Sequence, residues 1–341
     1  MRSGITSGSD ITLRPGTILD KPRVLEISAQ IWEGEDYVPA VIDYWLADQA
    51  GEFTVAEYNG EVMGFAKFTL LTPEDGWMEG IRVDPENRNL GIGKLLTLYF
   101  LDKAKALKLR SLRLSTHVDN RESIHIIEKF GFKPDAGFVY CSRRLGGASP
   151  EGPGAPPALG PAAAPVEAPA KVLAEVPNLA PMVRFLQNGD LAAGYIMSSE
   201  FYRCAGGYLP IGWKFQKVEE GLLANLPDFA DVYYVGDGMA DSIDGTPNGG
   251  IEGLMVIARS ARVSAELPVF FLEGDGQAQE QLIDYALELA RRKGFRFLEY
   301  MAPQGHSSLA VACKKGMREY CEGTSANAPD VFVYEYPYLH R

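Results

Sequence analysis

The strongest constraint on the fold of this chain comes from residues 80–96, which read as the end of a β-strand, a polar turn and a glycine-bearing loop that opens a helix. Gly91 and Gly93 let the backbone approach a ligand closely, with the loop N–H groups pointing outward. The helix behind them adds about half a positive charge at its N-terminus. Arg88 and Lys94 flank the loop with full charges. The segment therefore predicts a cradle for a pyrophosphate; the alternative is a tight turn that uses glycines only for geometry.

Two widespread phosphate loops do not fit this segment. A P-loop needs a hydroxyl residue after its lysine, but Leu95 follows Lys94. A dinucleotide fingerprint needs a different glycine spacing near the start of a βαβ unit. The segment instead resembles the coenzyme A loop of the GNAT superfamily of acetyltransferases, Arg/Gln-x-x-Gly-x-Gly/Ala after the fourth strand. The resemblance implies that acetyl-CoA is the co-substrate and that it is bound by Arg88, Asn89, Leu90, Gly91, Ile92, Gly93 and Lys94.

Length and composition limit the function classes. The chain has 341 residues, which suggests two domains, and its net charge of −12 argues against a nucleic-acid partner. No run of 18 apolar residues is present, so no membrane span or membrane partner is expected. The four cysteines show no zinc spacing, so no metal site is expected, and free thiols suit a reducing cytoplasm. We expect a cytoplasmic enzyme with a small-molecule ligand.

A compositional break divides the chain. Residues 147–170 are rich in Pro, Ala and Gly and cannot bury much apolar area, so they indicate an extended linker. We predict a catalytic domain over residues 1–146, a linker over 147–179 and a second domain over 180–341.

The first part gives a clear succession of elements. Strand patterns alternate with helical ones, and Asn59-Gly60 is a strong hairpin signal between two strands. The predicted strands are 11–13, 52–58, 61–71, 77–83, 112–116 and 137–143, and the predicted helices are 19–31, 38–47, the segment after the glycine loop, and 120–129. The order β-α-α-β-β-β-α-β-α-β is that of the GNAT fold. The resemblance implies an α/β (α+β) domain with a mixed, mostly antiparallel twisted sheet flanked by helices.

A second match supports this family. Asn120-Arg121-Glu122-Ser123, followed by Phe130-Gly131-Phe132, resembles the family's Asn-x-x-Ala/Ser…Gly-Phe segment. The resemblance implies that Asn120 and Ser123 contact the pantetheine arm. Asn120 also fits a helix N-cap, and one residue can do both.

The second part repeats the same order more faintly, with strands at 231–235, 250–259, 267–272, 295–301 and 331–336 and helices at 277–293 and 306–315. A duplicated GNAT-like domain is therefore expected. At its loop position the sequence reads Glu273-Gly274-Asp275-Gly276-Gln277, which has no arginine and carries two carboxylates. Such a loop should repel a pyrophosphate, so we interpret this domain as degenerate.

Acetyl transfer to an amine needs a proton acceptor for the amine and a donor for the thioester carbonyl. Glu79, on the strand leading into the loop, is the best candidate for the base; a polar strand residue or an amine anchor is the alternative. By resemblance, the backbone of Ile81, Arg82 and Val83 contacts the acetyl group and pantetheine. The family often has a tyrosine seven residues after the asparagine, but Ile127 stands there. Ser123, His125, Tyr140 or water are the alternatives for protonating the thiolate.

The substrate is expected near the first two helices. Residues 32–39 combine aromatic and acidic side chains, which suits a cationic amine, although an acidic loop that caps a helix at Asp36 is an equal alternative. Trp32, Glu35 and Tyr37 are the candidate substrate residues. This segment and residues 78–83 are similar to histidine N-acetyltransferases, which makes histidine a lead. The leading hypothesis is an acetyl-CoA-dependent N-acetyltransferase for a small amine that reacts by direct attack in a ternary complex. The alternatives are a non-catalytic acyl-CoA sensor or scaffold, and a protein lysine acetyltransferase with a targeting second domain.

Overall fold

The computed structural model describes residues 11–34, 36–146, 182–211, 213–218, 222–223, 225–236, 250–259, 266–319 and 328–336. These residues form two compact units. Unit 1 contains the described residues up to Asp135 together with residues 333–336, and unit 2 contains the described residues from Ala136 to Phe332. The predicted linker, 147–179, lies outside the described residues.

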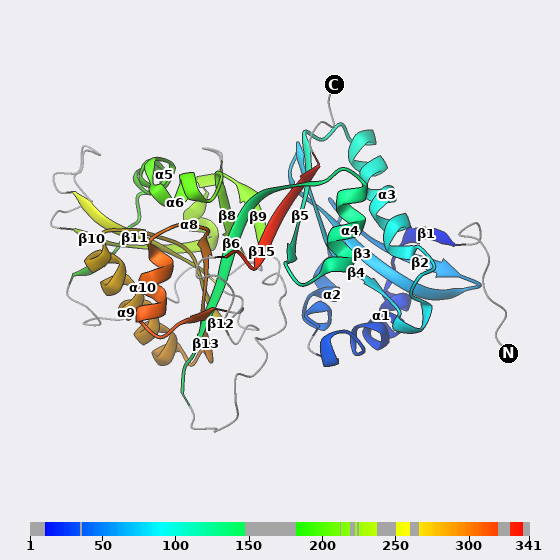
Figure 1. Cartoon of the computed structure of the whole chain (residues 1–341), viewed down its shortest axis with the longest axis horizontal. Helices are drawn as coiled ribbons and strands as arrows, with labels where there is room; N and C mark the ends of the chain where they lie inside the picture. The colour runs from blue at the N-terminus through cyan, green and yellow to red at the C-terminus, as the bar shows by residue number, and fades with distance from the viewer. Residues whose placement is uncertain are drawn as a thin grey trace. The chain divides into compact units, whose positions relative to one another are not determined.

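Unit 1 follows the predicted order of elements (Figure 1). Its helices and strands are β1 (Thr12–Pro15), α1 (Lys21–Ser28), α2 (Val38–Ala47), β2 (Glu52–Tyr58), β3 (Glu61–Thr72), β4 (Asp75–Val83), α3 (Ile92–Ala106), β5 (Ser111–His117) and α4 (Arg121–Lys129). The strands lie in the order β1-β2-β3-β4-β5-β15, where β15 (Val331–Tyr336) contributes residues 333–336. All pairs from β1 to β4 are antiparallel, and β4 is parallel to β5.

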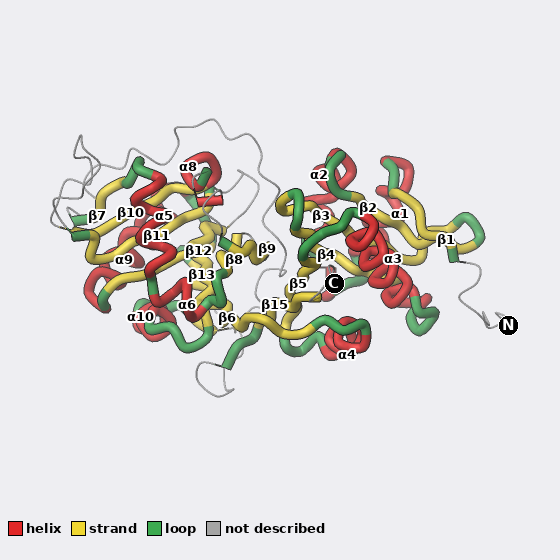
Figure 2. The backbone as a smooth tube through the Cα atoms, turned by 90° about the horizontal axis from the view of Figure 1, so that it is seen from above, coloured by secondary structure: helices red, strands yellow, loops and turns green. Residues whose placement is uncertain are grey.

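The hairpin between β2 and β3 turns at the predicted dipeptide. Asn59 and Gly60 both have positive φ, 51° and 80°, as a two-residue hairpin turn requires. Helices α1 and α2 pack on β3 and β2, while α3 packs on β3 and β4. Figure 2 shows α1 and α2 on one face of these strands and α3 on the other.

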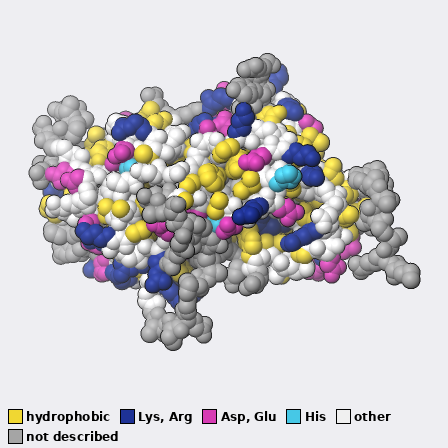
Figure 3. Space-filling view, in the orientation of Figure 1, with side chains coloured by type: hydrophobic (Ala, Val, Ile, Leu, Met, Phe, Trp, Pro, Cys, Tyr) yellow, Lys and Arg dark blue, Asp and Glu magenta, His cyan; other side chains and the backbone are white. Residues whose placement is uncertain are grey.

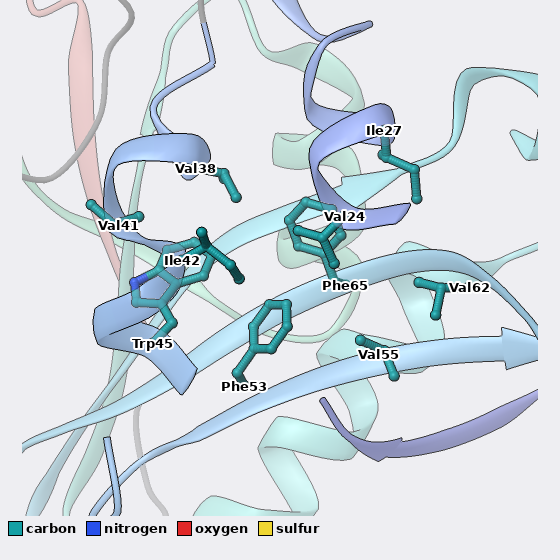
Figure 4. Close-up of a cluster of buried hydrophobic side chains, with 10 residues drawn as sticks. All are labelled: Val24, Ile27, Val38, Val41, Ile42, Trp45, Phe53, Val55, Val62 and Phe65. Carbon is teal, nitrogen blue, oxygen red and sulfur yellow. The ribbon is translucent and has the colours of Figure 1, made fainter. Parts of the chain in front are cut away.

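Apolar side chains from two helices and two strands form a core beneath α1 and α2 (Figure 4). Its buried members are Val24, Ile27, Val38, Val41, Ile42, Trp45, Phe53, Val55, Val62 and Phe65. The four from α2 follow the i, i+3, i+4, i+7 spacing of one helix face. Each fully buried side chain of this size contributes about 1.5–3 kcal/mol, so this core holds α2 firmly over the sheet.

In unit 2 the strands lie in the order β6-β13-β12-β11-β10-β7. Its elements are β6 (Lys133–Arg144), β7 (Val183–Phe185), α5 (Gly189–Ser198), α6 (Glu200–Cys204), β8 (Tyr208–Ile211), β9 (Lys214–Lys217), α8 (Leu226–Phe229), β10 (Ala230–Gly236), β11 (Ile251–Ala258), β12 (Glu266–Gly274), α9 (Gly276–Lys293), β13 (Phe297–Pro303), α10 (Ser308–Lys314) and β14 (Arg318–Glu319). Only β12 and β13 are parallel among its pairs. The predicted mixed sheet flanked by helices is confirmed, and the β8–β9 hairpin is an addition that the sequence pattern did not indicate.

The strands that end the two halves are exchanged relative to the prediction. The strand predicted at 137–143 was expected to close the first sheet, but β6 pairs antiparallel with β13 of unit 2, with Cys141 opposite Tyr300. Conversely, residues 333–336 of β15 belong to unit 1. There Arg113 Nε donates to Glu335 at 3.2 Å, and the Tyr334 hydroxyl donates to Glu128 at 3.2 Å. The division between the two compact units falls within β6 and β15.

The described surface carries both signs of charge. Figure 3 shows acidic and basic side chains interspersed with apolar ones over the face drawn. Among the described residues, none of the helices combines the length and apolar character needed to cross a membrane. Within the same residues, no group of three His, Cys, Asp or Glu side chains is arranged to hold a metal ion.

Candidate active site

The strand β4 carries a bulge at Gly80. In the ladder with β3, Phe65 pairs with Arg82 and Lys67 pairs with Glu79, so Gly80 and Ile81 together stand opposite one residue. Gly80 has φ +64°, and a Cβ there would lie 2.3 Å from the Trp45 ring on α2. Only glycine fits this position. The bulge re-aims the residues that follow it, Ile81, Arg82 and Val83.

Beyond the bulge, β4 and β5 diverge. Their parallel pairing covers only Asp75–Trp77 against Ser111–Arg113. Residues 78–83 of β4 and 114–117 of β5 continue past the last pair. The predicted backbone contacts at Ile81, Arg82 and Val83 lie along this open edge, where an extended ligand can add as a further strand would.

The loop after β4 leads to an uncovered helix N-terminus. Asn89 and Gly91 have φ of 69° and 80°. The first bond within α3 runs from Leu95 N to Gly91 O at 3.0 Å, so the N–H groups of Ile92, Gly93 and Lys94 precede it. Arg88, Asn89 and Lys94 are exposed, whereas the side chain of Ile92 is buried and anchors the turn. The structure therefore brings the predicted loop residues, with Leu90, into one turn.

Glu79 lies on the α1–α2 side of the sheet. Its side chain is buried, and the Thr69 hydroxyl donates to its Oε1 at 3.1 Å. Directly across the strand pair is Lys67, whose ammonium contacts Asp48 and donates to Phe68 O at 2.8 Å. Lys67 and Asp48 were not singled out in the sequence. The signal was present, because Lys67 is the one charged residue within the apolar run of β3.

The predicted substrate segment forms an aromatic and ionic cluster around Arg82. The Arg82 guanidinium donates to both oxygens of the buried Asp36, at 2.9 and 3.2 Å. It lies 4.4 Å from the centre of the Trp32 ring and 5.3 Å from that of Tyr37. Burial raises the pKa of the Tyr37 phenol far above its ordinary value, so this group is protonated at neutral pH. Trp32 is half exposed, and Glu35 lies outside the described residues.

Helix α4 packs beside the start of α3: a Cβ on Gly93 would lie 3.6 Å from Ile126. Asn120 is the N-cap of α4, since its Oδ1 accepts from Ser123 N at 3.3 Å. The cap uses the carbonyl oxygen and leaves the Nδ2 donors to other partners. Ile127 is 1% exposed and belongs to the core of unit 1.

Two of the alternatives for the missing tyrosine can now be located. His125 is exposed on α4. Tyr140 belongs to unit 2, where its buried hydroxyl donates to Glu299. His117, at the end of β5, is half-buried, and burial lowers its pKa despite the opposing charge of Asp119.

The corresponding loop of unit 2 is closed by its own side chains. Asp275 caps α9 by accepting from Ala278 N at 2.8 Å. Glu273 accepts from Phe201 N at 2.7 Å and from Gly274 N at 3.0 Å. Its Oε2 also lies 3.4 Å from Nε2 of the buried His306, which follows β13. The backbone N–H groups of Gly274 and Ala278, together with that of Phe201 on α6, therefore donate to carboxylates of the protein.

Comparison with known proteins agrees with this geometry. Residues 21–132 match the model of the acetyltransferase (GNAT) family. Mycothiol acetyltransferase of Thermomonospora curvata is 32% identical over 102 residues, which are 30% of this chain and 33% of that protein. The chain therefore matches about a third of the length of this curated relative.

Two solved structures share the fold over nearly the whole chain. A GCN5-related N-acetyltransferase from Sphaerobacter thermophilus has a TM-score of 0.59 and 13% identity, covering 97% of this chain and 96% of that one. A putative acetyltransferase from Pyrococcus horikoshii has a TM-score of 0.53 and 13% identity, covering 98% and 92%. Residues 21–132 thus form a domain that matches the GNAT acetyltransferase family.

Proposed function

We propose that the chain is an N-acetyltransferase that uses acetyl-CoA to acetylate a small amine in unit 1. One observation carries this proposal: the open edge of β4 beyond Gly80 leads, through residues 84–91, to the N-terminus of α3, where no side chain caps the helix. A ligand with an extended amide-bearing arm and a pyrophosphate matches both features, because the edge offers backbone groups and the helix offers N–H donors.

The residues on this path fit acetyl-CoA. Ile92, Gly93 and Lys94 supply backbone donors, and Arg88 and Lys94 supply exposed positive charge. Asn120 stands at the start of α4 beside this turn, with its amide donors directed to partners other than the cap. When bound, acetyl-CoA supplies the acetyl group as an activated thioester.

Glu79 is proposed as the proton acceptor for the amine. An α-amino group has a pKa of about 8, so near neutral pH a carboxylate has only to remove one proton before attack. Thr69 holds one oxygen of this carboxylate in place. Backbone N–H groups of residues 81–83 on the open edge would donate to the carbonyl oxygen as negative charge develops there.

The amine is proposed to enter from the α1–α2 side, past Trp32 and Tyr37. These aromatic rings and the carboxylate of Glu79 suit a cation. The similarity of residues 78–83 to histidine N-acetyltransferases makes histidine one amine to test. The mycothiol acetyltransferase that matches part of unit 1 makes amines related to mycothiol a second group to test.

Unit 2 is proposed to be a GNAT-like domain that has lost coenzyme A binding. The capping of α9 by Asp275 and the contacts of Glu273 support this, because the N–H groups of Ala278 and Gly274 already donate to these carboxylates and the two negative charges would repel a pyrophosphate.

The decisive experiment is turnover of the full chain with acetyl-CoA and a panel of small amines, with release of the thiol of coenzyme A as the readout. Acetylation of at least one amine is expected. Tight binding of acetyl-CoA with no turnover on any amine or on lysine peptides would favour a sensor or scaffold. No binding of acetyl-CoA would overturn the proposal.

A further inference from the structure

Three cationic side chains share the face of the sheet that carries Glu79. Lys67 is its direct cross-strand neighbour. Arg113 stands opposite Trp77, two residues earlier on β4. Arg82, beyond the bulge, reaches Asp36 and the two aromatic rings near α2. These are the cations among the described residues of this face that could meet a negative group of a substrate bound at Glu79.

Each of these cations is already held by a carboxylate. Lys67 contacts Asp48, and its side chain is 2% exposed. Arg82 binds Asp36, whose side chain is fully buried and also accepts from Ser28 at 2.7 Å. Arg113 lies 3.1 Å from Asp75 and 3.2 Å from Glu335. Withdrawing a cation from such a pair would leave a buried charge uncompensated, which is strongly unfavourable.

The same face has an excess of negative charge. The three cations stand against five carboxylates, those of Asp36, Asp48, Asp75, Glu79 and Glu335. Arg110 also contacts Asp75, but it is half exposed and pairs with Glu74 as well, so it does not change the balance. The exposed charges of Arg88 and Lys94 lie in the α3 loop proposed for the pyrophosphate.

The charge balance on this face determines which amines can bind at Glu79. A free α-amino acid carries its carboxylate two bonds from the nitrogen, so an amine held at Glu79 would bring that carboxylate beside described cations that are each already paired with a carboxylate. We propose that the acceptor lacks a free carboxylate beside its amino group, so that amides and decarboxylated amines are acetylated in preference to free α-amino acids. The proposal rests on the function proposed above and narrows its substrate class.

Matched substrates test this with the full chain. Each α-amino acid, histidine included, is compared with its own amide and with its decarboxylated amine by release of the coenzyme A thiol. We expect kcat/KM of the amide and of the decarboxylated amine to be at least tenfold higher than that of the free amino acid, in every pair that is turned over. Equal or better turnover of the free acids would overturn the substrate class. So would the absence of turnover in all pairs while acetyl-CoA still binds in calorimetry, whereas loss of that binding would overturn the proposed function itself.

A charge variant adds a second readout. Asp48→Asn removes the negative charge that Lys67 contacts, across from Glu79, while the amide oxygen can still accept from Gly51 N, which now lies 3.1 Å from Asp48 Oδ1. The preference for the amide over the acid should fall at least threefold. Asp43→Asn is the control, because it removes the same charge from an exposed position on α2 and should leave the preference unchanged. A preference unchanged in both variants would contradict the role assigned to the neutralised cations.

Discussion

Two strand–loop–helix segments invite comparison, β4 to α3 in unit 1 and β12 to α9 in unit 2. They differ in whether side chains of the protein accept hydrogen bonds from the backbone N–H groups at the start of the helix. In unit 1 the first bond of α3 begins at Leu95, and the N–H groups before it precede any bond within the helix. In unit 2 Asp275 caps α9, and Glu273 accepts from Phe201 N and Gly274 N. A helix N-terminus can bind an anion only if the protein's own side chains have not already satisfied it.

The gap between parallel strands shows the same contrast. In both units the parallel pairing covers only the first part of the strands. In unit 2 His306, which follows β13, lies beside Glu273 at the end of β12, and its Nδ1 is 2.6 Å from Ser308 Oγ. Side chains therefore bridge that gap. In unit 1 the bulge at Gly80 turns the edge of β4 toward the opening, which is why we place the reaction there.

The largest expected effect concerns Glu79 on β4, which we compare with Glu273 on β12. Glu79→Gln should lower kcat about 100-fold, because general-base catalysis contributes on the order of 10²–10⁴, and it should leave the affinity for acetyl-CoA unchanged. The acidic limb of the pH–rate profile should disappear. Glu273→Gln, the change on β12, should leave kcat as it is. Equal kinetics for wild type and Glu79→Gln would remove Glu79 from the mechanism.

The second effect concerns α4. Ile127 is almost fully buried, so Ile127→Tyr should overpack the core and cost about 1–3 kcal/mol of unfolding free energy. Ile127→Leu, which conserves the volume, should cost less in the same thermal or denaturant measurement. A stable Ile127→Tyr variant with faster turnover would show instead that protonation of the thiolate limits the rate.

The third effect tests the loops directly. Arg88→Glu should weaken acetyl-CoA binding at least tenfold, about 1.4 kcal/mol, because a charge-assisted phosphate contact is lost. Arg291→Glu makes the same charge change near the end of α9 and should leave the affinity alone. Calorimetry of the wild type should give one acetyl-CoA per chain. Two equivalent sites would contradict the difference drawn here between the loops.

The last effect is a pH dependence that belongs to unit 2. Burial and the nearby charge of Glu266 raise the pKa of Glu299 to about 8. Its unfolded pKa is near 4.5, so its contribution to stability is complete below about pH 4.5 and is lost as the pH rises toward 8. Glu299→Gln cannot ionise and should therefore lose less stability than wild type between pH 5 and pH 9. Parallel losses in thermal unfolding at the two pH values would show that this carboxyl is not protonated in the folded chain.

Local sequence patterns were enough to predict many of the elements of unit 1. Asn59-Gly60 identified the hairpin because few residues other than Asn and Gly tolerate positive φ. The glycines of residues 88–94 identified the turn before α3, and β4 was identified with Glu79 on it. These features are encoded by neighbouring residues, so they can be predicted without knowledge of the rest of the fold.

Partners that lie far apart in the chain could not be predicted in this way. Lys67 and Asp48 meet from a strand and a helix end, and Arg113 and Glu335 are separated by 222 positions. The alternation of β6 and β15 marks both as strands, but it does not say which sheet each joins. The exchange of these strands, and the closing of the unit 2 gap by His306, depend on tertiary packing.

The position of β15 in the sequence determines when unit 1 can complete its sheet during synthesis. β5 is synthesised long before the residues that will cover it, since Arg113 and its partner Glu335 are 222 positions apart. At about 5–20 residues per second, this interval lasts roughly 10 to 45 s. During that time the edge of β5 offers backbone groups to any other extended chain. Unit 1 therefore completes its part of the sheet only after the ribosome has made residues 333–336, which follow the described strands of unit 2 in the chain.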